Sequence, residues 1–209
     1  ENETIDVVVD SCIINYNNAD NVEYGSGIGF RVWGTATSLT VTNSEISNNY
    51  GGGHSSAAAI FLDGSSLTLN IDNVTISNNE GDGIYISASN EQSVINNVTI
   101  DSNTGIGISN LENSTLTNST ISNNLSGGLA NVQNSSLQNV IIDGNKMVPG
   151  TVGSEGVNGA GISYMVKNGA ELGYGLSVDI LIISVTSFFG LEFMFIVIAM
   201  ESLFGLLLV

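Results

Sequence analysis

Aliphatic residues recur along the chain in step with asparagine. The motif Ile-x-x-Asn occurs six times, and its Asn residues are successively 32, 30, 24, 21 and 21 residues apart. Eight residues before each of these Asn residues lies an aliphatic side chain, in the series Val9, Val41, Ile71, Ile95, Leu116 and Leu137. Because several columns keep the same spacing, we interpret the chain as an internal repeat. The bare unit is 21 to 24 residues, and the first two intervals carry insertions.

Each unit predicts short strands joined by tight turns. The units are rich in β-branched residues separated by Asn and Gly, which is typical of strands, and helical repeats usually run to about 33 residues or more. In the unit that ends at Asn103 we expect strands at 83–87, 93–95 and 98–100. Such strands have too few apolar residues to be buried alone, so each must stack on its copy in the next coil, about 4.8 Å away. The sequence therefore predicts an all-β solenoid of parallel strands, about six to seven coils long.

A second asparagine column lies six residues before the Ile-x-x-Asn asparagine. It consists of Asn43, Asn73, Asn97, Asn118 and Asn139. Asn tolerates the left-handed conformation that a bend between two strands requires, and its amide can bond to copies of itself above and below. We expect this column to form an asparagine ladder at one corner, and the Ile-x-x-Asn asparagines to do the same at the next.

Three stretches are typical of a known family: VTISNNEGDGIYIS at 74–87, VTIDSNTGIGIS at 98–109 and STISNNLSGGLANV at 119–132. Over about residues 5–146 the chain resembles the right-handed parallel β-helix proteins of the pectin-lyase-like superfamily. Segment 48–79 resembles the repeats of cell-surface adhesin-like and polymorphic outer-membrane proteins. The resemblance implies the fold, but this fold carries many functions. Family enzymes cleave acidic polysaccharides, the lyases with Ca²⁺-binding acids and a basic residue, the hydrolases with clustered Asp.

The repeat pattern stops after Asn145, because Pro149 stands where the repeat would place Gly. We expect three parts: β-helix repeats at 1–146, a Gly-rich connection or irregular last coil at 147–175, and an apolar segment at 176–209.

The apolar segment has three open interpretations. Between residues 180 and 209 only Glu192 and Glu201 are charged, and the longest uncharged run, 180–191, has 12 residues. A confident membrane span needs about 18. The segment is a membrane anchor, a surface buried between subunits, or a cap on the end of the β-helix. We expect anchoring or self-association through this segment.

The charge balance excludes some partners. The chain of 209 residues has 20 acidic and 3 basic residues, a net charge of −17. So few cations cannot neutralise phosphates, so we expect no nucleic-acid partner. The chain begins at Glu1 rather than Met, which fits an exported protein that has lost its signal, and equally a sequence cut at that point. An extracellular or cell-surface location is expected.

The residues that polysaccharide cleavage would need are scattered. Asp101 and Asp143 share a column, but the coil between them carries Ser122. Two strand spacings place the two carboxylates roughly 9.6 Å apart, beyond the ~5 Å of a retaining pair and at the limit for an inverting pair. The basic residues lie far apart in the repeat: Arg31, Lys146 and Lys167. We therefore expect no catalytic residues, and the protein is not expected to be an enzyme.

Other single residues have ordinary explanations. His54 lies in an insertion loop without nearby Asp or Cys partners, and we expect no metal there. Asp82 follows Glu-Gly in a turn, but the regular acidic nonapeptide of a Ca²⁺ loop is absent. Cys12 stands in a column with valines, so we expect a buried apolar residue. No metal or cofactor is expected.

Aromatic residues suggest a sugar-binding surface. If Ile60 and Ile84 point inward, then Phe61 and Tyr85 point outward on adjacent coils, and Arg31 and Trp33 share that parity. The four residues form a possible glycan platform. The alternative is that the aromatic rings stack between coils or are covered by the C-terminal segment.

Seven Asn-x-Ser/Thr sequons occur in a chain rich in these residues. Asn73, Asn97 and Asn118 lie in the corner column, where a buried amide would be unavailable. We therefore expect the possible N-glycosylation sites to be Asn2, Asn113 and Asn134.

Taken together, these patterns favour a non-catalytic extracellular structural or adhesin-like protein, anchored or self-assembling through its apolar C-terminus. A polysaccharide lyase or hydrolase and a glycan-binding module on the same fold are the alternatives.

Overall fold

The computed structural model describes ten segments of the chain: residues 5–19, 26–31, 37–51, 58–65, 67–89, 92–146, 161–164, 177–178, 181–186 and 192–197. Within them every regular element is a β-strand. Asn2, Trp33, His54, Pro149 and Lys167 lie outside the described residues.

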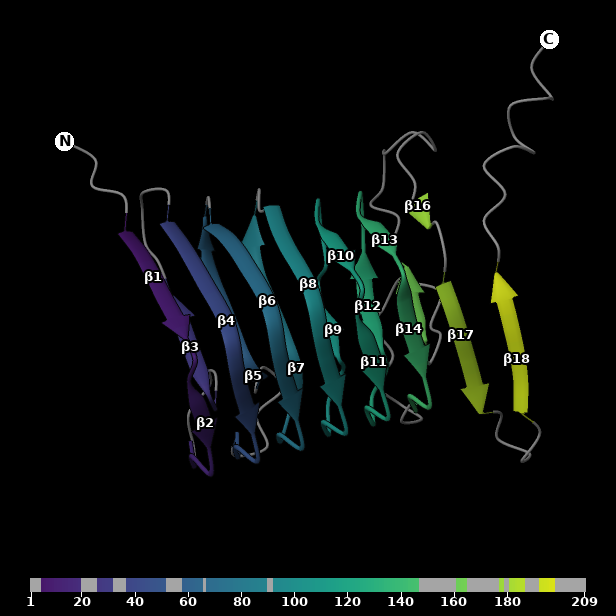
Figure 1. Ribbon diagram of the computed structural model, residues 1–209, viewed down its shortest axis with the longest axis horizontal. Helices are drawn as coiled ribbons and strands as arrows, with labels where there is room; N and C mark the ends of the chain where they lie inside the picture. Colours follow the sequence, from purple (N-terminus) through teal and green to yellow (C-terminus); the bar gives the residue numbers. More distant parts are fainter. Residues whose placement is uncertain are drawn as a thin grey trace, which may run out of the picture.

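The strands form two sheets, which Figure 1 shows as a stack that runs from the N-terminal to the C-terminal side. The larger sheet has twelve strands: β1 (Ile5–Asp10), β2 (Ile13–Asn15), β4 (Thr37–Ser47), β6 (Leu67–Ser77), β8 (Gln92–Asp101), β10 (Thr115–Thr117), β11 (Thr120–Ser122), β13 (Ser136–Gln138), β14 (Val140–Asp143), β16 (Ser177–Val178), β17 (Leu181–Thr186) and β18 (Glu192–Val197). The smaller sheet has six: β3 (Ile28–Arg31), β5 (Ala58–Ser65), β7 (Asp82–Ser89), β9 (Ile108–Ser109), β12 (Leu129–Val132) and β15 (Ile162–Tyr164).

Residues that share a column in the sequence repeat are paired with one another in neighbouring strands of the structure. Each strand from β1 to β17 pairs in parallel with its copy in a neighbouring coil. The isoleucines of the Ile-x-x-Asn motif are aligned one above another, in the series Ile14, Ile46, Ile76, Ile100, Ile121 and Ile142. The predicted parallel β-helix is therefore confirmed.

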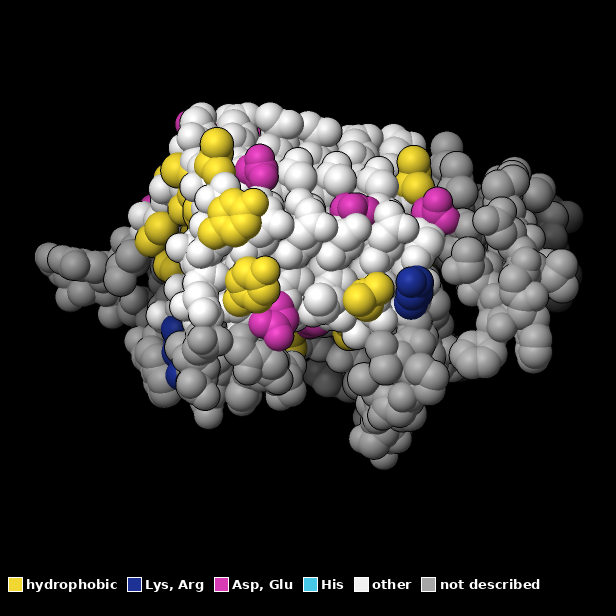
Figure 2. Space-filling view, turned by 90° about the horizontal axis from the view of Figure 1, so that it is seen from below, with side chains coloured by type: hydrophobic (Ala, Val, Ile, Leu, Met, Phe, Trp, Pro, Cys, Tyr) yellow, Lys and Arg dark blue, Asp and Glu magenta, His cyan; other side chains and the backbone are white. Residues whose placement is uncertain are grey.

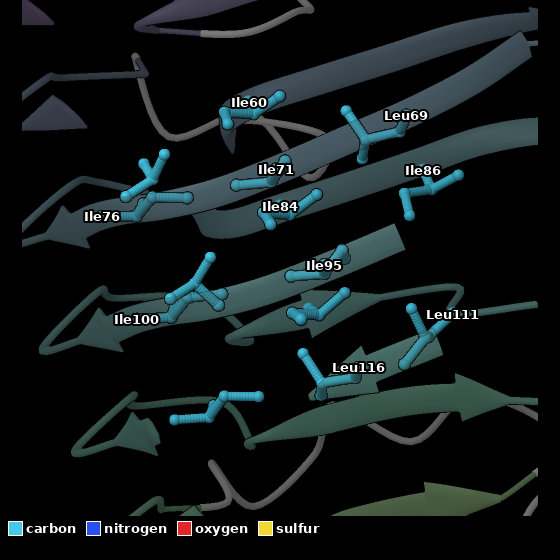
Figure 3. Packing of buried hydrophobic residues seen from close by; sticks show 14 of the residues in the cluster. Ile60, Leu69, Ile71, Ile76, Ile84, Ile86, Ile95, Ile100, Leu111 and Leu116 are labelled. Carbon is cyan, nitrogen blue, oxygen red and sulfur yellow. The ribbon is translucent and has the colours of Figure 1, made fainter. Parts of the chain in front are cut away.

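The core lies between the two sheets. Inward aliphatic side chains from both sheets meet there, and Figure 3 shows Ile60, Ile84 and Ile86 of the smaller sheet facing Leu69, Ile71 and Ile95 of the larger one. All are buried. Removing each such side chain from water contributes about 1.5–3 kcal/mol, which no coil gains without its neighbours.

One strand boundary differs from the sequence prediction. Strands expected at 93–95 and 98–100 are joined in β8, which bends at Asn97 with a φ of 51°. In the next coil the same two arms are separate, as β10 and β11, and both pair with β8. The left-handed residue turns the chain, but hydrogen bonding to neighbouring coils continues on both sides of it.

Parallel pairing continues past the end of the sequence repeat. Strand β15 pairs with β12, β16 with β13 and β17 with β14, so part of segment 147–209 extends both sheets. Strand β18 then pairs antiparallel with β17 and reverses the chain direction. Among the described residues no helix is long and apolar enough to cross a membrane.

Candidate functional site

A ladder of asparagine amides, buried in all but its first member, runs along the inside of one corner. It joins the exposed Asn17 to the buried Asn49, Asn79, Asn103, Asn124 and Asn145. The Nδ2 of Asn79 donates to Asn103 Oδ1 over 3.0 Å, and its backbone N–H donates to the same oxygen over 3.0 Å. Nδ2 also donates to the Ile46 carbonyl of the preceding coil over 3.0 Å. Between the asparagines themselves every amide donates to the asparagine of the following coil, so this series of bonds has a direction.

A column of small residues packs directly against this ladder. A Cβ at Gly107 would lie 2.5 Å from Ile121 Cγ2 and 2.6 Å from the Gly128 carbonyl oxygen, and Gly83 and Gly128 are equally confined. One coil instead carries Ala59, which precedes Ile60, and Ile60 pairs with Ile28 and Ile84, the residues that follow Gly27 and Gly83. The Gly and Ile-x-x-Asn columns therefore recur together because one occupies the space that the other leaves.

The predicted corner column lies on the outside of the molecule. Its five asparagines have φ between 49° and 55°. The Nδ2 of Asn73 donates to Asn43 Oδ1 over 2.8 Å, and that of Asn97 to Asn73 Oδ1 over 3.2 Å. Asn139 donates to Asn118 over 3.1 Å, but Asn118 donates to Asn96 instead of Asn97. These hydrogen bonds run toward the N-terminal side, opposite to the buried ladder.

Outward carboxylates act as acceptors between coils. Asp101 Oδ1 accepts hydrogen bonds from Ser122 Oγ (2.6 Å) and Asn123 Nδ2 (2.8 Å) of the next coil. Burial raises the pKa of Asp101, but these bonds and one from Ser102 outweigh it and lower the pKa overall. Asp101 and Asp143 both pair in register with Ser122, so a full coil separates them. The arrangement holds neighbouring coils together and leaves no close pair of carboxyl groups here.

Asp82 bridges two coils of the smaller sheet. Its Oδ1 accepts the backbone N–H of Ile106 over 2.7 Å, and its Oδ2 accepts the Ser109 hydroxyl over 2.5 Å. Burial raises the pKa of Asp82 to about 6, although both hydrogen bonds act in the opposite direction. In the described segments no three His, Cys, Asp or Glu side chains are grouped to hold a metal ion.

The predicted aromatic platform is only partly exposed, with Arg31 exposed, Tyr85 half-buried and Phe61 buried. Phe61 is only 3% exposed, and its ring stacks on Tyr85 of the next coil with centroids 5.4 Å apart and planes 8° apart. Arg31 Nε lies 2.7 Å from Asp63 Oδ2. Trp33 lies outside the described residues. Stacking between coils, the alternative to a glycan platform, is therefore what the structure shows for Phe61 and Tyr85.

Two tyrosines that sequence reasoning missed are exposed instead. Tyr16 is 72% and Tyr50 is 55% exposed, in the first and second coils. Tyr16 has a φ of 55°, at a corner that other coils fill with Asn48, Asn78, Ser102, Asn123 and Gly144. In the view of Figure 2, exposed hydrophobic side chains gather toward the N-terminal side of the molecule. The signal was in the sequence, since Tyr16 is a bulky residue in a column of Asn, Ser and Gly.

The exposed and buried sequon asparagines are not those that the sequence led us to expect. Asn113 and Asn134 are exposed, but so are Asn73, Asn97 and Asn118, so the corner column is not buried. The Nδ2 of Asn134 donates to Asn113 Oδ1 over 3.3 Å, which makes these two residues a ladder as well. The buried sequon is that of Asn124, which belongs to the inner ladder. Asn2 lies outside the described residues.

Cys12 is half-buried rather than fully buried. Its thiol donates to the Asp10 carbonyl over 3.2 Å. The expected burial fails because Cys12 lies in the first coil, where described residues cover it on one side only.

Comparison with known proteins gives one match. A family model described as "right handed beta helix region" matches residues 54–172, which is 119 of the 209 residues and more than half of the chain. No curated protein and no solved structure matches the chain significantly.

Proposed function

The chain belongs to the right-handed β-helix family, and on that premise we propose that it is a non-catalytic structural or adhesin-like protein of the cell surface or extracellular space. The β-helix fold serves both enzymes and structural proteins, so the proposal depends on the side chains.

The observation that carries the proposal is the use of the carboxylates. Asp10 accepts hydrogen bonds from Thr42 and Asn43 of the next coil, and Asp101 accepts the equivalent pair from Ser122 and Asn123. Cleavage of a glycosidic bond needs two carboxyl groups about 5–9.5 Å apart with the substrate between them, or an acid beside a basic side chain. Asp10 and Asp101 instead accept hydrogen bonds from neutral side chains and so link neighbouring coils.

The basic side chains support the same conclusion. Arg31 is paired with Asp63 on the smaller sheet, and Lys146 is an exposed residue at the end of the last regular coil. Neither is among the groups that bond to Asp10 or Asp101. A lyase needs a cationic or basic group beside its substrate-binding acids, so this separation favours a structural role.

The apolar segment 176–209 is proposed to hold the protein in place, by self-association or by insertion into a membrane or protein complex. Strand β18 supports this proposal, since its antiparallel pairing with β17 ends the parallel stack. The sequence of the segment is strongly apolar, and a long apolar surface is normally covered by another molecule or by lipid.

Two measurements on the full chain test the proposal. Polysaccharides of neutral and acidic types are incubated with the protein, and new reducing ends and unsaturated products are measured. Sedimentation without detergent and flotation with vesicles then report the particle state. We expect no turnover, and either large assemblies or vesicle binding. Turnover would contradict the structural role, and a monodisperse soluble monomer would contradict anchoring and assembly.

A second candidate function is glycan binding, favoured by the exposed rings of Tyr16 and Tyr50. Exposed tyrosines beside amide side chains can stack on sugar rings and bond to hydroxyl groups. Gel electrophoresis through neutral polysaccharides tests this function. Retardation that is lost in Tyr16→Asn/Tyr50→Thr and kept in Leu125→Thr, another exposed apolar residue, would support it.

A further inference from the structure

One corner of the solenoid carries a regular row of outward side chains. The residue after each buried ladder asparagine donates its backbone N–H to the carbonyl of the ladder asparagine in the preceding coil, which fixes the row. Leu125 lies between described coils on both sides and is still 38% exposed, so side chains in this row point away from the stack. In chain order the row is Tyr50, Glu80, Thr104, Leu125 and Lys146.

Two tyrosine rings lie side by side at this corner. Tyr50 is 55% exposed, and its N–H donates over 2.8 Å to the carbonyl of Asn17, the residue that follows Tyr16. Asn78 and Asn123 occupy the Tyr16 position in coils with described neighbours on both sides, and both are exposed. The two rings are therefore exposed because the corner directs them outward.

Acidic side chains lie near these rings. Glu80 follows Tyr50 in the row, about 4.8 Å further along the stack. Glu45 is an exposed residue of β4, in the same coil as Tyr50. Lys146, the basic residue of the row, is four coils from Tyr50, roughly 19 Å. In the view of Figure 2, acidic side chains lie beside the exposed hydrophobic ones on the N-terminal side.

This arrangement attracts cations in two ways. The chain has 20 acidic and 3 basic residues, so its field draws positive charge toward the corner. The face of an exposed tyrosine ring also attracts a cation directly. A ligand with both flat apolar faces and positive charge is therefore the best complement to Tyr16, Tyr50 and Glu80.

We propose that this corner binds a linear glycan whose sugars carry free amino groups. The sugar rings stack on Tyr16 and Tyr50, and an ammonium group lies against Glu80. This inference rests on the second candidate function, glycan binding, and names the class of glycan. A neutral glycan stacks on the same rings, but only an amino sugar adds an ion pair and a cation–π contact.

The backbone hydrogen bonds favour a glycan over a basic peptide. The N–H groups of Tyr16, Tyr50 and Glu80 all donate to carbonyls of neighbouring coils. An extended peptide that binds by strand addition needs such groups free, so it has no strand edge to pair with here. Sugar hydroxyls instead bond to side-chain amides, and Asn48 and Asn78 present amides at the same corner.

The test uses the full chain and isothermal titration calorimetry in mildly acidic buffer, where sugar amines are protonated. The probes are a glucosamine hexasaccharide and its fully N-acetylated form, which have the same sugar chain and differ in charge. Hexalysine with blocked ends carries the same charge as the first probe without sugar rings. It controls for unspecific attraction to an acidic chain.

Each variant has a matched control three coils away. Tyr50→Thr removes a ring, and Leu125→Thr makes a similar change at another exposed apolar residue of the same row. Glu80→Gln removes a charge, and Asp143→Asn does so at an exposed acid of a later coil.

We expect saturable binding of the glucosamine hexasaccharide. Tyr50→Thr should weaken it about 3- to 10-fold through lost stacking. Glu80→Gln should weaken it about 2- to 5-fold and reduce its salt dependence. Neither control variant should change it, and the acetylated hexasaccharide should bind about 3- to 30-fold more weakly.

Three results would overturn the inference. Equal affinity for both hexasaccharides, lost from both in Tyr50→Thr, would remove the preference for amino groups and leave glycan binding intact. Binding of neither hexasaccharide, or binding that Tyr50→Thr leaves unchanged, would remove glycan binding at this corner as well. Hexalysine binding that is as tight and as sensitive to Tyr50→Thr would mean that the occupant is a basic peptide.

Discussion

The Oδ1 atom of Asn103 accepts two hydrogen bonds from Asn79, one from its backbone N–H and one from its Nδ2 group. Both residues are fully buried. The position therefore joins the backbone of one coil to the side chain of the next, out of reach of water. The same double link recurs at each of the five steps from Asn17 to Asn145.

Replacing Asn103 by Ala should destabilise the protein by about 2–4 kcal/mol, because two buried donors of Asn79 lose their acceptor. Urea denaturation followed by circular dichroism measures the loss. The control is Asn97→Gly, which removes an exposed ladder amide and keeps a residue that accepts positive φ; it should cost no more than about 1 kcal/mol. Equal losses would mean that the buried ladder has no special role.

Gly107→Ala should cost about 1–3 kcal/mol, because the added methyl group overlaps Ile121 and the Gly128 carbonyl. The coil that already carries Ala59 is the control, because it shows whether the same column tolerates a methyl group elsewhere. Ala59→Gly should cost about 0.5–1 kcal/mol through the greater freedom of the unfolded chain. A Gly107→Ala protein as stable as the original would show that the coil spacing adjusts freely.

The stability of the protein should fall as the pH rises from about 4 to 6. The folded state keeps the Asp82 proton up to a pKa of about 6, whereas the unfolded chain releases it near 3.8, so protonation favours the folded state in this interval. The loss is about 1–3 kcal/mol at most. Asp10 and Asp101 have lowered pKa values, so their opposite effect lies below pH 3.8. Thermal melts from pH 4 to 7 measure the slope, and Asp82→Asn should remove it.

Tyr16→Asn should stabilise the chain by about 0.5–1.5 kcal/mol, because a left-handed residue costs about 1–2 kcal/mol unless it is Gly or Asn. Denaturation of the two proteins checks the sign. A bulky residue kept at a strained, exposed corner suggests a role in binding, so the same variant should lose any affinity for neutral glycans. A variant that is less stable than the original would show that the Tyr16 ring contributes packing.

The sequence predicted the stacking of the coils because burial and register act on the same columns. It could not predict which asparagine column is buried. Asn78 and Asn79 are adjacent and have the same side chain. The backbone bends at Asn78, where φ is 56°, and there Asn79 points inward while Asn78 stays exposed. Alternation placed Phe61 on the face away from the core, but alternation does not say whether that face is covered.

The sequence also predicted only part of where the parallel stack ends. Thr186 stands three residues after Ile183, where earlier units carry Asn, so the motif disappears from the sequence. Backbone pairing needs no particular side chain, and Ile142 and Ile183 remain in register. A pattern of side chains can therefore end before the sheet that it first revealed.

Because the buried ladder makes the same contact, in the same direction, between successive coils, one regular coil can take the place of another. From Asn79 to Asn145 each coil offers the same acceptor on one side and the same donors on the other. Removing residues 104–124, one unit of 21, would leave Asn103 facing Asn145 through the same kind of contact. The length of the molecule is thus an adjustable quantity, counted in whole units, and a gene can shorten or extend such a protein without inventing a new interface.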